Sequence, residues 1–224
     1  MKKPICLLLL LMCVGALPLA AALTETYSYS SVNVAVPGGD ASGISLTPNV
    51  SSAIASITSV RVSLNISSDS NGSLYAYLSH DGVLCVLLNR VGRTTGNLAG
   101  YDNNGFNITL DDSVVNRDIH VYNTIAPPIP GSSLTGLWQT DARNIDPDQV
   151  LDTRSRNAGL NLFQTQGASG SWTLFVASLE SGGTTTLNSW SLEITGAAVP
   201  EPQAYCFAAG LLLLGFAAFR KWHV

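Results

Sequence analysis

The chain has few of the residues that form cross-links or catalytic centres. Between its two apolar ends, residues 23–199 contain a single cysteine, Cys85, two histidines and no lysine. One cysteine excludes an intramolecular disulfide in this segment, so the fold must depend on a hydrophobic core. Cys85 lies in the apolar run VLCVLL, which favours a small buried hydrophobic residue over a nucleophile.

Positive charge is also scarce. Residues 23–199 carry seven arginines against fourteen carboxylates, a formal net charge of −7. Such a surface does not attract nucleic-acid phosphates or anionic lipids, so no nucleic-acid partner is expected. Divalent cations or a hydrated polysaccharide are compatible with this charge. The segment is long enough for one domain with a sizeable core.

The first 22 residues have the pattern of a secretory signal peptide. Lys2 and Lys3 precede an apolar stretch from Ile5 to Leu19, and small residues for cleavage end at Ala22. The protein is therefore expected to be exported.

The C-terminal segment is apolar and ends near a basic pair. Residues 204–219 contain no charge and would measure about 24 Å as a helix, against a hydrocarbon core of roughly 30 Å. This length predicts a short transmembrane helix. Arg220 and Lys221 are expected to stay on the cytoplasmic side as a stop-transfer anchor.

Apolar and polar residues alternate along the middle of the chain. The pattern is clearest in SITSVRVSLNIS, SLYAYLSHDGVLCVLLN, SWTLFVASLE and LNSWSLEITG. A period of two indicates β-strands, and Asp81-Gly82 predicts a two-residue hairpin turn. Long amphipathic helical patterns are missing, which favours an all-β sandwich or jelly roll. Residues 124–159 are the least strand-like part and are expected to form a long connection.

Acidic residues provide the candidate metal-binding chemistry. One pair ends a predicted strand, and the others lie in the long connection: Asp111, Asp112, Asp141, Asp146 and Asp148. Oxygen ligands on irregular loops suit calcium, although no EF-hand loop is present. Two alternatives remain open: these side chains bond to their own turns, or they pair with Arg143, Arg154 and Arg156.

The histidines lie in no recognisable catalytic motif. His80 stands beside the predicted turn and His120 lies in DIHVYN, and no Gly-Thr-Ser-x-Ala nucleophile stretch occurs. A Ser–His–Asp triad is defined by geometry, but nothing in the sequence predicts one, so no enzymatic activity is expected. Four aromatic residues are candidates for stacking on sugars or, equally, for packing in the sheets: Tyr75, Tyr77, Tyr101 and Trp138.

Residues 55–195 resemble the P domain (P/Homo B) of kexin- and furin-like proprotein convertases. The closing segment of that family has a Trp-x-Leu strand, a glycine-rich turn and a Leu-x-x-Trp-x-Leu strand. The matching positions are Gly170, Trp172, Leu174, Gly182, Gly183, Leu187, Trp190 and Leu192. The stretch ITSVRVSLNISSDSNGSLYAYLSHDGVLCVLLNRVG resembles the opening block, although Ser73 replaces an aspartate and His80-Asp81-Gly82 replaces a proline-containing turn. The resemblance implies a non-catalytic jelly-roll β-sandwich that stabilises a subtilisin-like protease.

The tail resembles a PEP-CTERM sorting signal. Its recognised element would be Pro200, Glu201 and Pro202, followed by the apolar helix and the anchor residues Arg220 and Lys221. Proteins with this signal are made by Gram-negative bacteria that secrete exopolysaccharide, and an exosortase in the inner membrane cuts near the motif. The resemblance implies an inner-membrane precursor that is released to the cell surface or extracellular matrix.

These predictions define three parts: a signal peptide (1–22), a P/Homo B-like sandwich (23–199) and a sorting signal (200–224). The expected protein is an exosortase-sorted envelope or exopolysaccharide-matrix component with a non-catalytic binding or structural module. The alternative is an accessory P domain that stabilises or positions a subtilisin-like serine protease encoded elsewhere.

Overall fold

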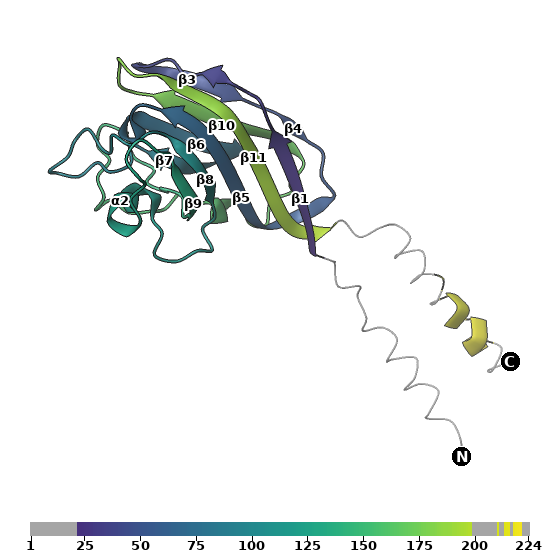
Figure 1. Cartoon of the computed structure of the whole chain (residues 1–224). Helices are drawn as coiled ribbons and strands as arrows, with labels where there is room; N and C mark the ends of the chain where they lie inside the picture. The colour runs from purple at the N-terminus through teal and green to yellow at the C-terminus, as the bar shows by residue number, and fades with distance from the viewer. Residues whose placement is uncertain (1–21, 199–209, 211–212, 216, 221–224) are drawn as a thin grey trace. The chain divides into compact units, whose positions relative to one another are not determined.

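The computed structural model describes residues 22–198, 210, 213–215 and 217–220 (Figure 1). Leu23–Ala197 form one compact unit, to which the following description applies. The predicted signal peptide up to residue 21, the motif Pro200–Pro202 and Lys221 lie outside the described residues. Of the predicted 204–219 span, the described positions are helical, and none of the described helices has the length and apolar character to cross a membrane.

The first sheet contains the strands β1 (Ala22–Tyr29), β11 (Thr185–Ala198), β5 (Ile54–Ser68), β8 (Phe106–Leu110) and β9 (Leu134–Trp138) in that spatial order. The short β2 (Val34–Ala35) pairs with β11. β5 and β8 are antiparallel, whereas β8 and β9 are parallel.

The second sheet contains β4 (Asn49–Val50), β10 (Gly170–Ser178), β6 (Leu74–His80) and β7 (Val83–Asn89). β3 (Asp40–Leu46) precedes β4 along the chain. The remaining elements are short: η1 (Asn71–Ser73), η2 (Ile119–Val121), α2 (Tyr122–Ile125) and η3 (Leu160–Phe163). The expectation of a mostly β domain is confirmed, with two sheets.

One hydrophobic core receives the apolar rows of both sheets. In β5, Val62, Leu64 and Ile66 are fully or almost fully buried, and the polar residues between them face outward. Leu78 and Leu174 contribute from the second sheet to the same cluster. The period of two therefore sorts apolar side chains inward and polar side chains outward.

The predicted hairpin is present. β6 and β7 pair antiparallel from His80 opposite Val83, and the turn between them has φ +46° at Asp81 and +78° at Gly82. Positive φ at both central residues is the conformation that Asp-Gly favours in two-residue hairpins.

The predicted long connection, residues 124–159, is wrong in one respect because it contains β9. Leu134–Trp138 pairs parallel with β8 at the edge of the first sheet. Gly136 lies in the centre of this strand, with φ +98°. Because glycine has no side chain, it interrupts the alternation of apolar and polar residues that would identify the strand in the sequence.

The two ends of the domain lie side by side. The hydroxyl oxygens of Thr24, near the start of β1, and Thr195, near the end of β11, are 2.8 Å apart. The start of β1 and the end of β11, where the rest of the chain is attached, therefore lie at the same end of two neighbouring strands.

Candidate functional site

The segment after β9 folds along the free edge of β7. The Asp141 amide donates to the Leu87 carbonyl at 3.0 Å, and the Ala142 amide donates to the Val86 carbonyl at 2.9 Å. The Val86 amide in turn donates to the Ala158 carbonyl at 2.9 Å. This pairing covers an exposed sheet edge and brings polar side chains into the interior.

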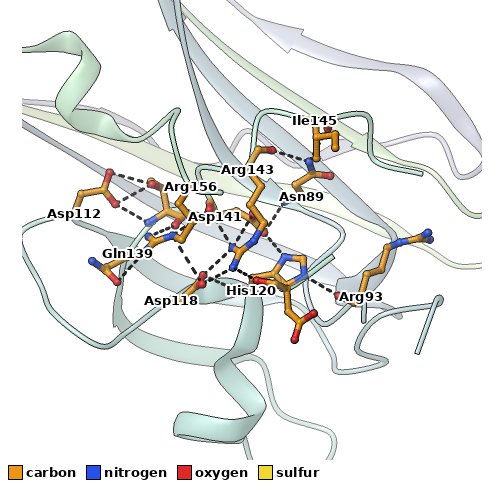
Figure 2. Close-up of polar contacts among 12 residues, drawn as sticks. Asn89, Arg93, Asp112, Asp118, His120, Gln139, Asp141, Arg143, Ile145 and Arg156 are labelled. Carbon is orange, nitrogen blue, oxygen red and sulfur yellow. Dashed lines mark hydrogen bonds and ion pairs between the residues drawn. The ribbon is translucent and has the colours of Figure 1, made fainter. Parts of the chain in front are cut away.

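A buried ionic cluster joins this segment to η2 (Figure 2). We call it the His120 cluster; its members are Asp118, His120, Asp141 and Arg143. His120 and Asp141 are fully buried, and Arg143 is 3% exposed. Asp118 caps η2 by accepting a hydrogen bond from the His120 amide at 2.9 Å.

Both ring nitrogens of His120 face acceptors. Nδ1 lies 2.7 Å from Asp141 Oδ2, and Nε2 lies 3.0 Å from the Arg93 carbonyl oxygen. Only the doubly protonated imidazolium can donate both bonds. Burial favours the neutral ring, but the hydrogen bond to Asp141 and the attraction of its charge outweigh burial and raise the pKa of His120.

Arg143 lies between the two carboxylates of the cluster, as Figure 2 shows. Its Nη2 donates to Asp118 Oδ2 at 2.7 Å and its Nη1 donates to Asp141 Oδ1 at 3.2 Å. Burial acts to raise the pKa of Asp118, but the bond to Arg143 and the charge of Arg143 lower it overall. His120 and Arg143 thus face Asp141 and Asp118, Arg156 also lies 3.8 Å from Asp118, and these ion pairs bind the connection to the domain.

The second histidine of the domain is equally enclosed. His80 Nδ1 and Nε2 lie 3.0 Å and 2.9 Å from the carbonyl oxygens of Ser171 and Gly167. Its ring stacks on Trp172 with centroids 4.0 Å apart and an interplanar angle of 2°. Neither described histidine therefore presents a free ring nitrogen to solvent.

The predicted calcium ligands all make contacts within the chain. Asp111 pairs with Arg61 at 2.6 Å, and Asp112 accepts from the amide of Thr140 at 2.8 Å. Asp146 accepts from the Asp148 amide at 2.8 Å. The Asp148 side chain pairs with Arg90 at 3.1 Å, and Asp141 belongs to the His120 cluster.

No group of three or more metal-ligating side chains forms within the described part of the chain. Of the arginines named in the sequence alternative, Arg143 is a partner, and it pairs with Asp141. Asp111 and Asp148 pair instead with Arg61 and Arg90. Asp146 bonds to its own turn, which is the other alternative. Calcium binding stays a prediction.

The four aromatic candidates divide between surface and core. Trp138 is 1% exposed and donates from Nε1 to the Thr135 carbonyl, and Tyr101 packs against Tyr122. Tyr75 and Tyr77 lie on the outer face of the second sheet. There they contact Phe175, which was not among the four candidates although it alternates with Leu174 and Val176 in β10.

The positions that carry the P-domain resemblance are mostly core residues. Five of them are buried: Trp172, Leu174, Leu187, Trp190 and Leu192. Trp190 stacks against Tyr29 of β1 with centroids 4.6 Å apart. The motif thus describes how the sheets pack, and it includes no side chain arranged for chemistry.

The His120 cluster predicts that stability falls as pH rises. The folded state keeps a proton on His120 that the unfolded chain releases above the ordinary pKa of 6.5. Its contribution is fully present below that value and is lost as pH rises through the raised folded pKa. We expect the urea midpoint to decrease from about pH 6 to about pH 8.

The matched comparison is the same titration of His120→Asn, which retains His80 and should show a shallower decrease. An equal slope in both proteins would contradict a charged His120. Asp118 has its effect at low pH. Because its pKa is lowered in the folded state, it contributes stability that is lost as pH falls through the folded pKa.

No protein-family model matches the chain, and no curated protein matches it. Among solved structures, it is similar to a chain in the complex of the Aeromonas sobria serine protease with its chaperone (TM-score 0.43, 16% identity, 85% of this chain). It is also similar to the serine protease of Aeromonas sobria alone (TM-score 0.44, 17% identity, 84% of this chain). This chain spans 29% of the length of those chains. Because these TM-scores are low, function is argued from the residues of the chain itself.

Proposed function

We propose that this chain is an exported, exosortase-sorted component of the cell envelope or exopolysaccharide matrix, with a jelly-roll, P-domain-like module that binds or assembles without catalysis. The tail carries the sorting part of the proposal: Pro-Glu-Pro, an apolar segment and a basic pair, behind an N-terminal export signal. Exosortase is the processing partner, and the inner membrane holds the precursor by the apolar segment.

The observation that supports a non-catalytic role is the engagement of both histidines of the domain. His80 and His120 are buried, and each has both ring nitrogens bonded to acceptors. A general base needs a free lone pair within reach of the proton that it abstracts. Burial also raises the pKa of the Cys85 thiol well above its ordinary value, which disfavours the nucleophilic thiolate.

The position of the domain ends supports processing after folding. Thr24 and Thr195 are in contact, so both terminal segments are attached at the same end of the neighbouring strands β1 and β11. Removal of residues 1–22 takes only Ala22 from β1, and removal of the residues after Val199 takes none from β11, so the pairing of these strands is otherwise retained. A cut near Pro200 would therefore release a complete domain.

The proposal is tested by intact-mass measurement of the protein from washed cells and from the matrix fraction of its own host. We expect a matrix species that begins at Leu23 and ends between Val199 and Pro202. A membrane species that still carries Lys221, with no processed form, would contradict sorting and make the tail a permanent anchor.

The alternative, an accessory domain for a subtilisin-like protease encoded elsewhere, rests on the sequence resemblance to the P domain. Affinity purification of the full-length chain from its host, with and without mild crosslinking, separates the two roles. Recovery of a protease whose thermal stability depends on this chain would favour the accessory role.

A further inference from the structure

A shallow groove of about 160 Å³ crosses the outer face of the first sheet. Its polar side chains come from four adjacent strands, β1, β11, β5 and β8, which Figure 1 shows side by side. They are Ser28, Ser30, Ser63, Asn65, Asn107, Ser189 and Ser191, of which Ser30 directly follows β1. Neighbouring strands lie about 4.8 Å apart, so the four strands present hydroxyl and amide groups over roughly 14 Å.

Much of the hydrogen-bonding capacity in the groove is unused. Within the described residues, the side chains of Ser28, Ser30, Asn107 and Ser191 make no hydrogen bond to the rest of the protein, whereas the Ser63 hydroxyl lies 2.9 Å from that of Thr109. Asn65 is oriented instead, because its Oδ1 accepts from Asn188 Nδ2 at 3.1 Å. Its own amide nitrogen remains available to a ligand.

The groove carries no charge, although the domain is strongly acidic. The charged side chains nearby on the same face, Arg61 and Glu193, are paired at 3.2 Å, and Arg61 also binds Asp111 at 2.6 Å. Among the described residues of this face, no unpaired cation is available to attract an anionic polymer, and the formal charge of −7 on residues 23–199 repels one. An uncharged ligand fits this surface.

The composition of the groove also argues against a protein partner. The centres of protein interfaces are enriched in aromatic residues, methionine and arginine and are poor in serine. Here the two aromatic residues of the lining stack on each other: Trp190 is only 3% exposed and Tyr29 is partly buried, so the open groups are mainly hydroxyls and amides. Sugar hydroxyls donate and accept hydrogen bonds at once, as the Ser and Asn side chains do.

We propose that this groove binds an uncharged polysaccharide chain laid across β1, β11, β5 and β8. The proposal rests on the proposed function in one respect, namely that export places the domain beside extracellular polysaccharide. The groove lies away from the end of the strands at which the rest of the chain is attached: Ser191 is seven residues from Ala198 along β11, or roughly 24 Å. A ligand can therefore bind while the ends of the domain are still tethered.

The test is affinity electrophoresis of the full-length chain in gels that contain a single polysaccharide. A polyoxyethylene detergent is used because it has no sugar headgroup. Konjac glucomannan and hydroxyethyl cellulose are the uncharged probes, and alginate is the anionic probe. The expected result is retardation by at least one uncharged polymer and none by alginate.

The key variant is Asn107→Ala/Ser191→Ala, which removes two groups without an intramolecular bond. We expect its dissociation constant to rise roughly ten- to thirty-fold, the effect of two ordinary hydrogen bonds. Asn49→Ala/Ser171→Ala is the matched control. It exchanges the same residue types at exposed, directly paired positions of β4 and β10 and should bind like the unmodified protein.

Retention of full affinity by Asn107→Ala/Ser191→Ala would overturn the proposal, as would preferential binding of alginate. If Tyr77→Ala loses binding while that double variant retains it, the ligand lies on the second sheet and the groove is wrong. Absence of retardation by both uncharged polymers also counts against it. None of these outcomes affects the intact-mass test, so failure of the groove is distinguishable from failure of sorting.

Discussion

Replacement of Asp141 by alanine is expected to destabilise the domain by about 3–5 kcal/mol. Asp141 is fully buried and bonds to both cations of the His120 cluster, at 2.7 Å to His120 and 3.2 Å to Arg143. It also accepts a hydrogen bond from the backbone amide of Asn89 at 3.3 Å. Loss of the carboxylate leaves Asp118 as the only anion in the cluster for two buried positive charges.

The measurement is urea-induced unfolding of the full-length chain at about pH 6, where His120 is protonated because its pKa is raised. Asp148→Ala is the matched control, because it removes an ion pair to Arg90 whose carboxylate is 78% exposed. That variant should lose less than about 1 kcal/mol. Similar losses for the two variants would contradict a structural role for the buried cluster.

Asp141→Asn provides a graded version of the same test. The amide keeps the volume and one acceptor oxygen of the carboxylate but removes its charge. We expect a loss between those of the alanine variant and the control. If Asp141→Ala fails to fold, this variant still reports whether charge or shape dominates the contribution of Asp141.

Most of the long strands could be predicted from the sequence, whereas β1 could not. β5, β6, β7, β10 and β11 overlap the four runs singled out there, although β7 is a continuous apolar run without alternation. β1 was missed because Glu25 stands in its inward row between Leu23 and Tyr27. The structure accommodates this carboxylate with bonds from the Tyr27 hydroxyl and, at 3.1 Å, from the Ala53 amide.

The His120 cluster could be predicted only in part. The sequence suggested that aspartates of the connection pair with arginines, which is the case for Asp141 and Arg143. It did not show that His120 is the second partner, because Asp141 and His120 are 21 residues apart. Their meeting depends on the edge pairing with β7 and on Ala142, whose φ of +58° is rarely adopted by residues other than glycine.

The surface groove left no signal of its own. Each serine or asparagine in it reads as an ordinary outward position of a strand, and the four strands that form it come from distant parts of the chain. Only the spatial order β1-β11-β5-β8 places these side chains on one face. Ligand chemistry at a sheet surface therefore requires the topology as well as the alternation.

Trp172→Ala is the second variant with a large expected effect, again about 3–5 kcal/mol. Trp172 is fully buried, stacks on His80 and packs against Phe163 with centroids 5.0 Å apart. Its Nε1 donates to the Ala168 carbonyl at 2.9 Å. Truncation leaves a cavity, removes that bond and exposes one face of the His80 ring.

Unfolding of Trp172→Ala should be followed by far-ultraviolet circular dichroism, because the substitution removes a fluorophore. Thr173→Ala is the matched control: it lies on the same strand, faces outward and bonds only the exposed Thr47 hydroxyl at 2.9 Å. Its loss should stay below about 1 kcal/mol. Equal losses would mean that Trp172 is not an anchor of the core. We do not expect that outcome, because Trp172 is completely buried and has no surface on which to act.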